Sequence, residues 1–232
     1  MSHHLDILFE DNHLLIVNKN AGMLVQGDRT GDKPLAEHCK TYIKKRYQKP
    51  GAVFLGVVHR LDRPVSGVVV FARTSKALER MNKLFREKAV KKTYWAATLN
   101  KPKAENGRLV NWLRKDPKNN TTKAFRSEQK NALKSELEYK VIGQVGKYSL
   151  IEVNPLTGRP HQIRVQLSHM GCPINGDLKY GAPKPNPDAS INLHAKSLEF
   201  IHPVKKEMIK IFAPLPTNIV WDLFTGLEEY PE

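Results

Sequence analysis

Two short apolar runs, Ala52–Val58 and Val68–Phe71, place the strongest constraint on how this 232-residue chain can fold. Both are rich in valine or phenylalanine and have the length of a buried strand, so we expect two strands that lie in the core. Neither approaches the roughly 20 apolar residues that a helix needs to span a membrane. Pro64 and Gly67 interrupt the segment between them, which predicts an irregular loop at His59–Gly67.

The remaining pattern mixes strands and helices without a regular βαβ alternation, which is typical of an α+β fold. The pattern predicts further strands at residues 5–9, 14–17, 93–99, 137–142, 148–153, 193–200 and 208–212. It predicts helices at residues 34–47, 75–88 and 160–170. Residues 101–134 are polar and basic, with a loop tip expected at 119–122. No low-complexity linker divides the chain, so residues 1–232 are expected to form a single domain.

Positive charge is concentrated in one part of the sequence. The chain carries a net charge of +15, and residues 38–134 hold 25 basic and 6 acidic residues, whereas the rest has a slight acidic excess. A regional excess favours a binding surface for a polyanion, with nucleic acid the first expectation and an anionic membrane the second. A solvated basic face without a partner is the alternative interpretation.

The sequence lacks the motifs that are typical of several classes of protein chemistry. Cys39 and Cys172 are far apart, so neither a disulfide framework nor a Cys-x-x-Cys zinc site is indicated. The Walker-type phosphate loop, the Gly-x-Gly-x-x-Gly fingerprint and the zinc-deaminase signature are absent. Strand-like sequence follows the first four residues directly, so no signal peptide is expected and the cytoplasm is the predicted location.

Asp62 lies between Arg60 and Arg63 on the predicted loop. A carboxylate beside guanidinium groups stays ionised, and an ionised carboxylate can serve as a nucleophile or as a general base. The alternative is a structural aspartate that is satisfied by nearby backbone amides or by a salt bridge. Spacing alone does not separate these two interpretations.

A second polar cluster, Gly158–Val165, opens the helix predicted at 160–170. His161 and Arg164 are three residues apart, so on a helix they would share one face. An arginine held on a helix can orient a carboxylate through two parallel hydrogen bonds. The alternative is a basic helix surface on a protein that is basic as a whole.

The segment Lys91–Trp95 is the third candidate. Alternation along a strand puts Lys92 and Tyr94 on one face, and Thr93 and Trp95 on the other. A tyrosine that faces a cleft can stack on a base or move a proton. An edge-strand tyrosine that caps the core is the alternative.

Together and in this order, the three clusters resemble the signatures of the RluA-type RNA pseudouridine synthases. The matching segments are His59-Arg60-Leu61-Asp62-x-x-x-Ser66-Gly67, Lys92-x-Tyr94-x-Ala96 and Gly158-Arg159-x-His161-Gln162-Ile163-Arg164-Val165. Asp11–Gly22 resembles the opening motif of that family, and Gly176–Gly181 resembles the segment after the third signature. The resemblance runs from about Leu5 to Leu215, nearly the whole chain.

This resemblance implies the pseudouridine synthase fold, with a mixed, mainly antiparallel central sheet, flanking helices and a catalytic cleft. It implies that Asp62 is the catalytic aspartate, that Arg164 pairs with it, and that Tyr94 stacks on the target base. Arg60 would enter the RNA stack when the target uridine flips out. The residues expected to bind RNA or to support base flipping are Arg60, Arg63, Lys92, Arg159 and His161. No metal ion or organic cofactor belongs to this chemistry.

The resemblance therefore predicts an isomerase that converts specific uridines of structured RNA, either tRNA or a stem-loop of rRNA, to pseudouridine. The expected partner is RNA rather than a membrane, and a monomer is expected. Many relatives carry an N-terminal S4 RNA-binding domain, which is not expected here because the chain begins at the opening motif. Four residues differ from those usual at their positions in the family's motifs: Asn20, Val65, Pro160 and Gln166. These differences put the identity of the substrate and the geometry of the loops in doubt.

Two other functions compete with this prediction. One is a catalytically silent RNA-binding protein on the same fold, against which the presence of Asp62, Tyr94 and Arg164 argues. The other is a glycoside-cleaving enzyme that uses Asp62 alone, although such enzymes usually need a second carboxyl group.

Overall fold

The structure is a computed structural model that describes residues 5–28 and 30–227 of the chain. The described residues divide into two compact units: those up to Lys91 together with Ala195–Pro214, and Lys92–His194 together with those from Leu215 onward. Each unit contains strands, helical segments and a hydrophobic cluster of its own. The organisation as one catalytic domain therefore stays a prediction.

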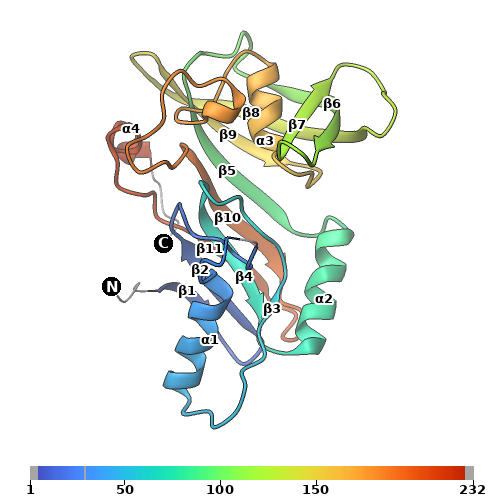
Figure 1. The fold of residues 1–232 in the computed structure, drawn as a ribbon, viewed down its shortest axis with the longest axis vertical. Helices are drawn as coiled ribbons and strands as arrows, with labels where there is room; N and C mark the ends of the chain where they lie inside the picture. Colours follow the sequence, from blue (N-terminus) through green and yellow to red (C-terminus); the bar gives the residue numbers. More distant parts are fainter. Residues whose placement is uncertain (1–4, 29, 228–232) are drawn as a thin grey trace. The chain divides into compact units, whose positions relative to one another are not determined.

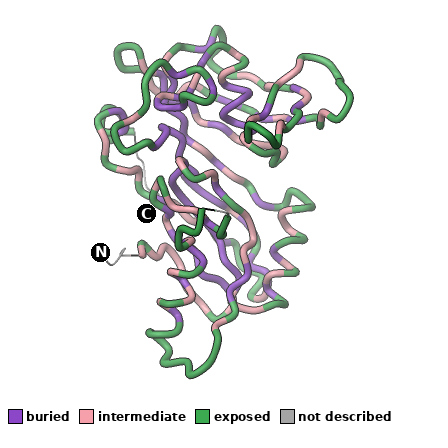
Figure 2. The backbone as a smooth tube through the Cα atoms, in the orientation of Figure 1, coloured by how far each residue is buried: buried purple, intermediate pink, exposed green. Residues whose placement is uncertain are grey.

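The first unit contains a sheet whose central strands are buried on both faces. Four strands are neighbours in the order β1 (Asp6–Glu10), β2 (Leu14–Lys19), β4 (Ser66–Ala72) and β10 (Leu193–Ile201), as Figure 1 shows. β11 (Met208–Phe212) pairs with β10, and β3 (Gly56–Val57) pairs with β4. Every residue of β4 is buried, and buried residues, drawn purple in Figure 2, are common along the strands of this sheet. The prediction of a buried strand after the loop is confirmed.

Two helices complete this unit close to the predicted positions. α1 (Leu35–Arg46) buries Leu35, Cys39 and Ile43 on one stripe and ends on three basic residues, which suit the negative end of the helix dipole. In α2 (Ser75–Arg86), Met81 packs against Val68 and Val70 of β4. The hydroxyl of Thr74 caps α2 by accepting the backbone N–H of Ala77 over 3.1 Å.

The strand expected at Ala52–Val58 is much shorter than predicted. Only Gly56 and Val57 pair with β4, and Phe54 is exposed. β10 is also a neighbour of β4, on the side away from β2, so only a short stretch of that edge is left for β3. The expectation of a buried strand over the whole run is therefore wrong, since only Leu55 and Gly56 of it are buried, and its pairing depends on a strand more than 120 residues further along the chain.

The second unit contains five strands in the order β5 (Lys91–Thr98), β9 (Tyr148–Pro155), β8 (Leu133–Val145), β6 (Asn106–Asp116) and β7 (Thr121–Phe125). The pairs between these neighbours are antiparallel. α3 (Gln162–His169) packs against β6 and β7, where its Val165 meets Leu113 and Tyr180. The short helix α4 (Ile219–Asp222) and the 3₁₀ turns at Leu178–Tyr180 and Thr225–Leu227 complete the unit.

Residues 101–134, expected to be a polar and basic loop, contain all of β6 and all of β7. The sequence did not predict these two strands because they have few apolar residues in alternation. One face of the β6–β7 pair carries charged residues, and the other face buries only Asn111, Leu113 and Thr122. β6 takes its register from β8, with Leu113 opposite Leu133, and that pairing is not visible in a local pattern. The loop tip was placed nearly correctly, since the turn lies between Asp116 and Thr121.

These elements agree with the α+β class predicted from the sequence, because helices accompany a sheet whose strands pair mostly in the antiparallel sense. Within the described residues, no helix is both long enough and apolar enough to cross a membrane.

Candidate active site

Asp62 lies in the irregular loop between β3 and β4, and its side chain is half-buried. Leu61 and Val65 on either side are buried, so the loop is anchored in the core at two points. The backbone N–H of Val65 donates to the Asp62 carbonyl over 3.1 Å, which closes a turn. The predicted loop is therefore present, and it holds the backbone of Asp62 in a short turn.

Gly67 sets the direction in which the chain leaves this loop. Its φ of +114° lies in the region that favours glycine, and a Cβ placed there would come 2.3 Å from the carbonyl oxygen of Ala195. β4 therefore approaches β10 more closely than any side chain would permit. The sequence predicted that Gly67 breaks regular structure, whereas it lies inside β4 as the point of closest approach.

The other side of the Asp62 loop is tied to the turn that follows β2. The backbone N–H of Gly22 donates to the Arg63 carbonyl over 2.8 Å, and Nε of Arg63 donates to the Gly22 carbonyl over 3.0 Å. Arg63 also forms an exposed ion pair with Asp32 at 2.8 Å. Arg63 thus stabilises the loop itself, and its expected contact with RNA stays a prediction, as does that of the exposed Arg60.

Lys19, the last residue of β2, is a charged residue that the sequence analysis did not select. Its side chain is completely buried, and Nζ donates to the carbonyls of Asn20, Met23 and Arg63. Burial lowers the pKa of Lys19 to about 7, while the charge of the nearby Asp62 carboxylate acts against this shift. The sequence gives one indication that Lys19 is buried, which is its position at the end of an apolar strand inside the opening motif.

Arg164 is buried in α3, so the interpretation of this cluster as a basic helix surface is wrong for Arg164. Its Nε lies 2.7 Å from Oδ2 of Asp177, and its Nη2 lies 2.8 Å from Oδ1. The guanidinium carbon also lies 5.1 Å from the centre of the Tyr180 ring. Asp177 is a site residue that sequence reasoning missed, although it belongs to the segment that resembles the family after the third signature.

The sequence predicted that His161 and Arg164 share one face of a helix, and this prediction is wrong because His161 lies outside α3. It precedes α3 in a left-handed conformation, with φ of 55°, and its Nδ1 lies 2.6 Å from the hydroxyl of Tyr180. The same hydroxyl accepts the backbone N–H of Thr122 over 2.8 Å. Burial raises the pKa of Tyr180, so its hydroxyl keeps its proton. Pro160 accordingly lies before the helix rather than in its first turn.

Gln162 organises the segment that carries Arg159. Its buried side chain accepts hydrogen bonds from the Thr157 hydroxyl over 2.8 Å and from the Arg159 backbone N–H over 3.0 Å. It also donates to the carbonyl of Glu136 over 3.0 Å. The side chain of Arg159 itself is exposed, which leaves it accessible to an anionic ligand.

Tyr94 and Lys92 follow the alternation that the sequence predicted for β5. Both side chains are half-buried, whereas Thr93 and Trp95 on the opposite face are buried. Trp95 belongs to the hydrophobic cluster with Trp221 and Phe224, and Tyr94 is not part of that cluster. The second signature therefore presents its tyrosine on the face opposite this core.

Cys39 and Cys172 are buried free thiols, and burial raises the pKa of Cys39 to about 12. Over residues 5–28 and 30–227, no three or more His, Cys, Asp or Glu side chains gather as a metal ion would require.

The site residues fall into two groups, one in each unit. The first unit brings Asp62 near Lys19 and ties Arg63 to Gly22. The second unit brings Arg164 to Asp177, and both Arg164 and His161 to Tyr180. The expected pairing of Arg164 with Asp62 joins residues of different units and stays a prediction, as does the role of Tyr94.

Comparisons with known proteins give a consistent result. The model of the family described as RNA pseudouridylate synthase matches residues 13–169. Ribosomal large subunit pseudouridine synthase C of Vibrio cholerae is 32% identical over 219 residues, which cover 92% of this chain and 66% of that protein. An uncharacterized RNA pseudouridine synthase of Bacillus subtilis is 33% identical, over 93% of this chain and 70% of that protein. The chain thus spans about two thirds of the length of these relatives.

Solved structures agree with the fold that the sequence predicted. The structure titled Human RNA Pseudouridylate Synthase Domain Containing 4 matches with a TM-score of 0.79 at 26% identity, over 98% of this chain and 95% of that one. Human RNA Pseudouridylate Synthase Domain Containing 1 matches with a TM-score of 0.73 at 23% identity, over 93% of this chain and 85% of that one. The predicted fold is confirmed.

Proposed function

Because this chain belongs to the RNA pseudouridylate synthase family, we propose that it is an isomerase that converts uridine in RNA to pseudouridine. In this reaction the C1′–N1 bond breaks, the uracil turns, and a C1′–C5 bond forms. C5 loses a proton and N1 gains one, so substrate and product have the same atoms. The observation that carries the proposal is Asp62, a half-buried carboxylate held in a closed turn inside the first family signature.

Asp62 is the group that we expect to attack the substrate. An ionised carboxylate can add to C1′ of the sugar, add to C6 of the base, or promote a glycal intermediate, and these routes stay open. Each route requires the target base to leave the RNA stack, which costs a few kcal/mol and least in loops or weakly paired regions. We propose that Arg60, an exposed side chain on the same loop, fills the gap that the base leaves.

We propose that Arg164 pairs with Asp62 and that Tyr94 stacks on the flipped base. Asp177 engages Nε and Nη2 of Arg164, which leaves the edge that carries Nη1 outside that ion pair. A guanidinium can serve two carboxylates through two edges in this way, because its five N–H donors lie in one plane. A snug, partly aromatic pocket is needed to hold the detached uracil while it turns, and Tyr94 is the wall that we expect.

The substrate that we propose is large-subunit ribosomal RNA. Two of the relatives of this chain are named ribosomal large subunit pseudouridine synthase C, and this chain is 32% and 34% identical to them. Transfer RNA is the other outcome that the experiment distinguishes. We further propose that the protein acts as a monomer, without a cofactor, in the cytoplasm.

The proposal is tested with purified protein and unmodified transcripts of ribosomal RNA and transfer RNA. We expect pseudouridine at defined positions of the ribosomal transcript, read by modification mapping, and its loss from those positions in cells that lack the protein. Product in the transfer RNA alone would keep the activity and correct the substrate. RNA binding without product would favour the catalytically silent protein, and release of free uracil would favour the glycoside-cleaving enzyme.

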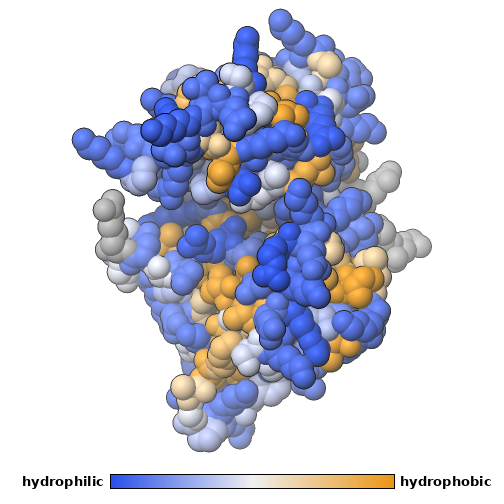
Figure 3. Space-filling model, turned by 90° about the vertical axis from the view of Figure 1, so that its right-hand side faces the viewer, coloured by the Kyte–Doolittle hydropathy of each residue, from blue (hydrophilic) through white to orange (hydrophobic). Residues whose placement is uncertain are grey.

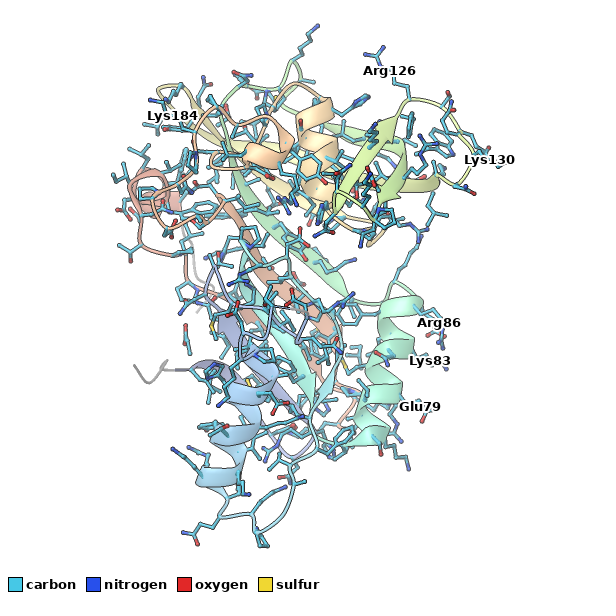
Figure 4. The ribbon with its side chains drawn as sticks, in the orientation of Figure 1. Glu79, Lys83, Arg86, Arg126, Lys130 and Lys184 are labelled. Carbon is cyan, nitrogen blue, oxygen red and sulfur yellow. The ribbon has the colours of Figure 1, made fainter. Side chains whose placement is uncertain are left out.

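The basic residues of β6, β7 and the turn between them form the surface that we propose for the RNA backbone. Lys115, Lys118 and Lys123 are all exposed there. Figure 4 shows the labelled Arg126 and Lys130 pointing away from the ribbon in the segment that follows β7. Hydrophilic residues cover most of the face drawn in Figure 3, with hydrophobic residues confined to patches. Phosphate contacts of this kind supply affinity without reading sequence.

Replacing Lys115, Lys118 and Lys123 together by alanine is expected to weaken RNA binding and to flatten its dependence on salt. Each lost phosphate contact lowers the slope of log affinity against log salt concentration by about one unit. Filter binding over a range of salt concentrations measures both effects. The matched control replaces three exposed lysines that lie outside the basic region at residues 38–134, namely Lys147, Lys184 and Lys206. Equal losses in the two triple variants would show that net charge alone, rather than this surface, holds the RNA.

A further inference from the structure

Tyr47 is an aromatic residue that lies on the surface, directly after α1. It is 45% exposed, and Phe54, further along the same connection to β3, is 49% exposed. Among the residues that the structure describes, no other phenylalanine, tyrosine or tryptophan is classed as exposed. Figure 2 draws this connection largely in green, the colour of exposed residues. Aromatic side chains carry large apolar surfaces that are mostly buried, so two exposed rings in one short segment call for an explanation.

The ring of Tyr47 is held in place although it is exposed. Its hydroxyl donates to Oε1 of Glu10 over 2.9 Å, and the guanidinium carbon of Arg73 lies 4.6 Å from the ring centre. Arg73 is itself fixed, because its side chain is only 9% exposed and its Nη1 donates to the same Glu10 oxygen over 2.9 Å. A ring that is already ordered loses little conformational entropy when a ligand binds to it.

The backbone at the end of α1 is fixed as well. The N–H of Lys49 donates to the carbonyl of Lys44 over 3.1 Å, and the N–H of Gln48 donates to that of Lys45 over 3.4 Å. These two hydrogen bonds form a Schellman motif, in which Gln48 takes the left-handed conformation, with φ of 47°. The motif therefore holds Tyr47 and the lysines around it on an ordered piece of backbone.

The same segment is positively charged without compensation. No acidic residue occurs between Glu37 and Asp62, and the basic residues in that stretch are Lys40, Lys44, Lys45, Arg46, Lys49 and Arg60. Within residues 5–28 and 30–227, no ion pair is formed by Lys44, Lys45 or Lys49. The helix dipole favours cations in the last turn of α1, but its effect ends there and Lys49 lies beyond it. The charge of this segment suits a polyanion.

The position of the Tyr47 ring favours RNA over an anionic membrane. An aromatic residue that anchors a protein to a bilayer inserts its ring into the interface between headgroups and acyl chains. The hydroxyl end of Tyr47 instead turns to Glu10 of β1, and the ring lies against Arg73. Stacking uses the face of a ring, and a base is available for it where the RNA is unpaired. The exposed Arg46, 5.9 Å from the same ring centre, adds a cation for the adjoining phosphate.

We propose that residues 44–54 bind an unpaired segment of the substrate RNA, with one base stacked on Tyr47 and the neighbouring phosphates held by Lys44, Lys45 and Lys49. Phe54 offers a second ring. It lies two residues before Gly56, whose pairing with Ala72 ties this chain segment to the strand that leads into Arg73. The inference rests on the proposed function, which supplies RNA as the ligand. Stacking and phosphate contacts are tolerant of sequence, so this surface adds affinity without selecting the target uridine.

The experiment measures binding of a short single-stranded RNA that carries 2-aminopurine, a fluorescent base whose emission falls when it stacks. We expect the wild type to quench this emission. Tyr47→Leu should bind the single strand about 10-fold more weakly and quench less, because it lacks the stacking ring. Tyr47→Phe keeps the ring and loses only the hydroxyl, so it should bind and quench like the wild type. If Tyr47→Phe lost as much as Tyr47→Leu, stacking would be overturned.

The matched control is Met208→Ala, which removes an exposed apolar side chain, 64% exposed, from β11 of the same unit. It should leave the affinity unchanged. A second comparison uses the same RNA annealed to its complement, whose bases are already paired and which Tyr47→Leu should bind as well as the wild type does. A loss in Tyr47→Leu that is no larger than in Met208→Ala, or that is equal for single strand and duplex, would overturn the inference.

The charges are tested separately by replacing Lys44, Lys45 and Lys49 together by alanine. The slope of log affinity against log salt concentration should fall by about three units, one for each lost phosphate contact. The charge-matched control is the triple variant of Lys147, Lys184 and Lys206 described above, and an equal fall in that variant would overturn the phosphate contacts.

Vesicles of phosphatidylserine and phosphatidylcholine test the membrane as the alternative occupant. If Tyr47→Leu lost vesicle binding and kept its RNA affinity, the surface would be a membrane anchor and the inference would be wrong. Thermal unfolding shows whether Tyr47→Leu folds. If it does not, Phe54→Leu and the triple variant of Lys44, Lys45 and Lys49 decide, and wild-type RNA affinity in both would overturn the proposal.

Failure of the proposed function is distinguishable from failure of this inference, because binding is measured without turnover. A wild type that forms no pseudouridine but stacks the single strand on Tyr47 would keep the surface and remove the function. An active wild type whose Tyr47→Leu variant binds the single strand equally well would remove the inference alone.

Discussion

Replacing Asp62 by asparagine is expected to lower the rate of pseudouridine formation by about 10³-fold or more, because the amide lacks both the charge and the nucleophilic oxygen. Asparagine has nearly the same size, and the turn around Asp62 is closed by a backbone hydrogen bond that the change does not touch. RNA affinity is therefore expected to stay close to that of the wild type. Single-turnover rates and filter binding on the same transcript measure the two quantities separately.

The matched control is Glu79→Gln, which also removes one carboxylate from the first unit. Glu79 is exposed on α2 and is labelled in Figure 4, where its side chain points away from the ribbon. This variant should keep the wild-type rate. If Asp62→Asn or Asp62→Ala formed product at the rate of the control, the assignment of Asp62 as the catalytic aspartate would be wrong.

Replacing Arg164 by methionine is expected to inactivate the protein and to destabilise it as well. The change leaves the carboxylate of Asp177, which is 1% exposed, in the interior without its guanidinium partner. Breaking a buried pair in this way lowers the free energy of unfolding by about 3–5 kcal/mol. Urea denaturation measures this loss, and single-turnover assays under conditions where the variant stays folded measure the rate.

The double variant Arg164→Met, Asp177→Asn separates the two effects. No charge is then left buried without a partner, so most of the lost free energy of unfolding should return. Activity should stay low, because the guanidinium that we expect to pair with Asp62 is still missing. If the double variant regained activity, Arg164 would serve only as the partner of Asp177. An exposed pair offers the control, since loss of Lys40 opposite Glu37 should change stability by less than about 1 kcal/mol.

The residues that the sequence predicted well are those whose environment follows from local pattern. Leu35, Cys39 and Ile43 recur at helical spacing, and the structure buries them on one stripe of α1. Tyr94 and Trp95 alternate along β5 and lie on opposite faces. Pattern also located the Asp62 loop, because Pro64 marks it and apolar residues flank it. Such features depend on neighbours a few residues away.

Predictions failed where a residue's surroundings come from distant parts of the chain. β3 is short because β10 also pairs with β4, and β6 exists because β8 supplies its partner. His161 was expected on α3, but the strained conformation that places it before the helix accompanies its contact with Tyr180. Neither the strand pairing nor this contact leaves a periodic trace in the sequence.

The sequence by itself determined the order of apolar and polar segments, the α+β class and the family signatures that single out Asp62, Tyr94 and Arg164. Only the tertiary structure decided the partners of the charged groups: Arg164 meets Asp177, and Lys19 meets a carbonyl 44 residues further along. The physical reason is that burial follows from local periodicity, whereas a buried charge is stabilised only by the donors and acceptors that long-range packing brings to it.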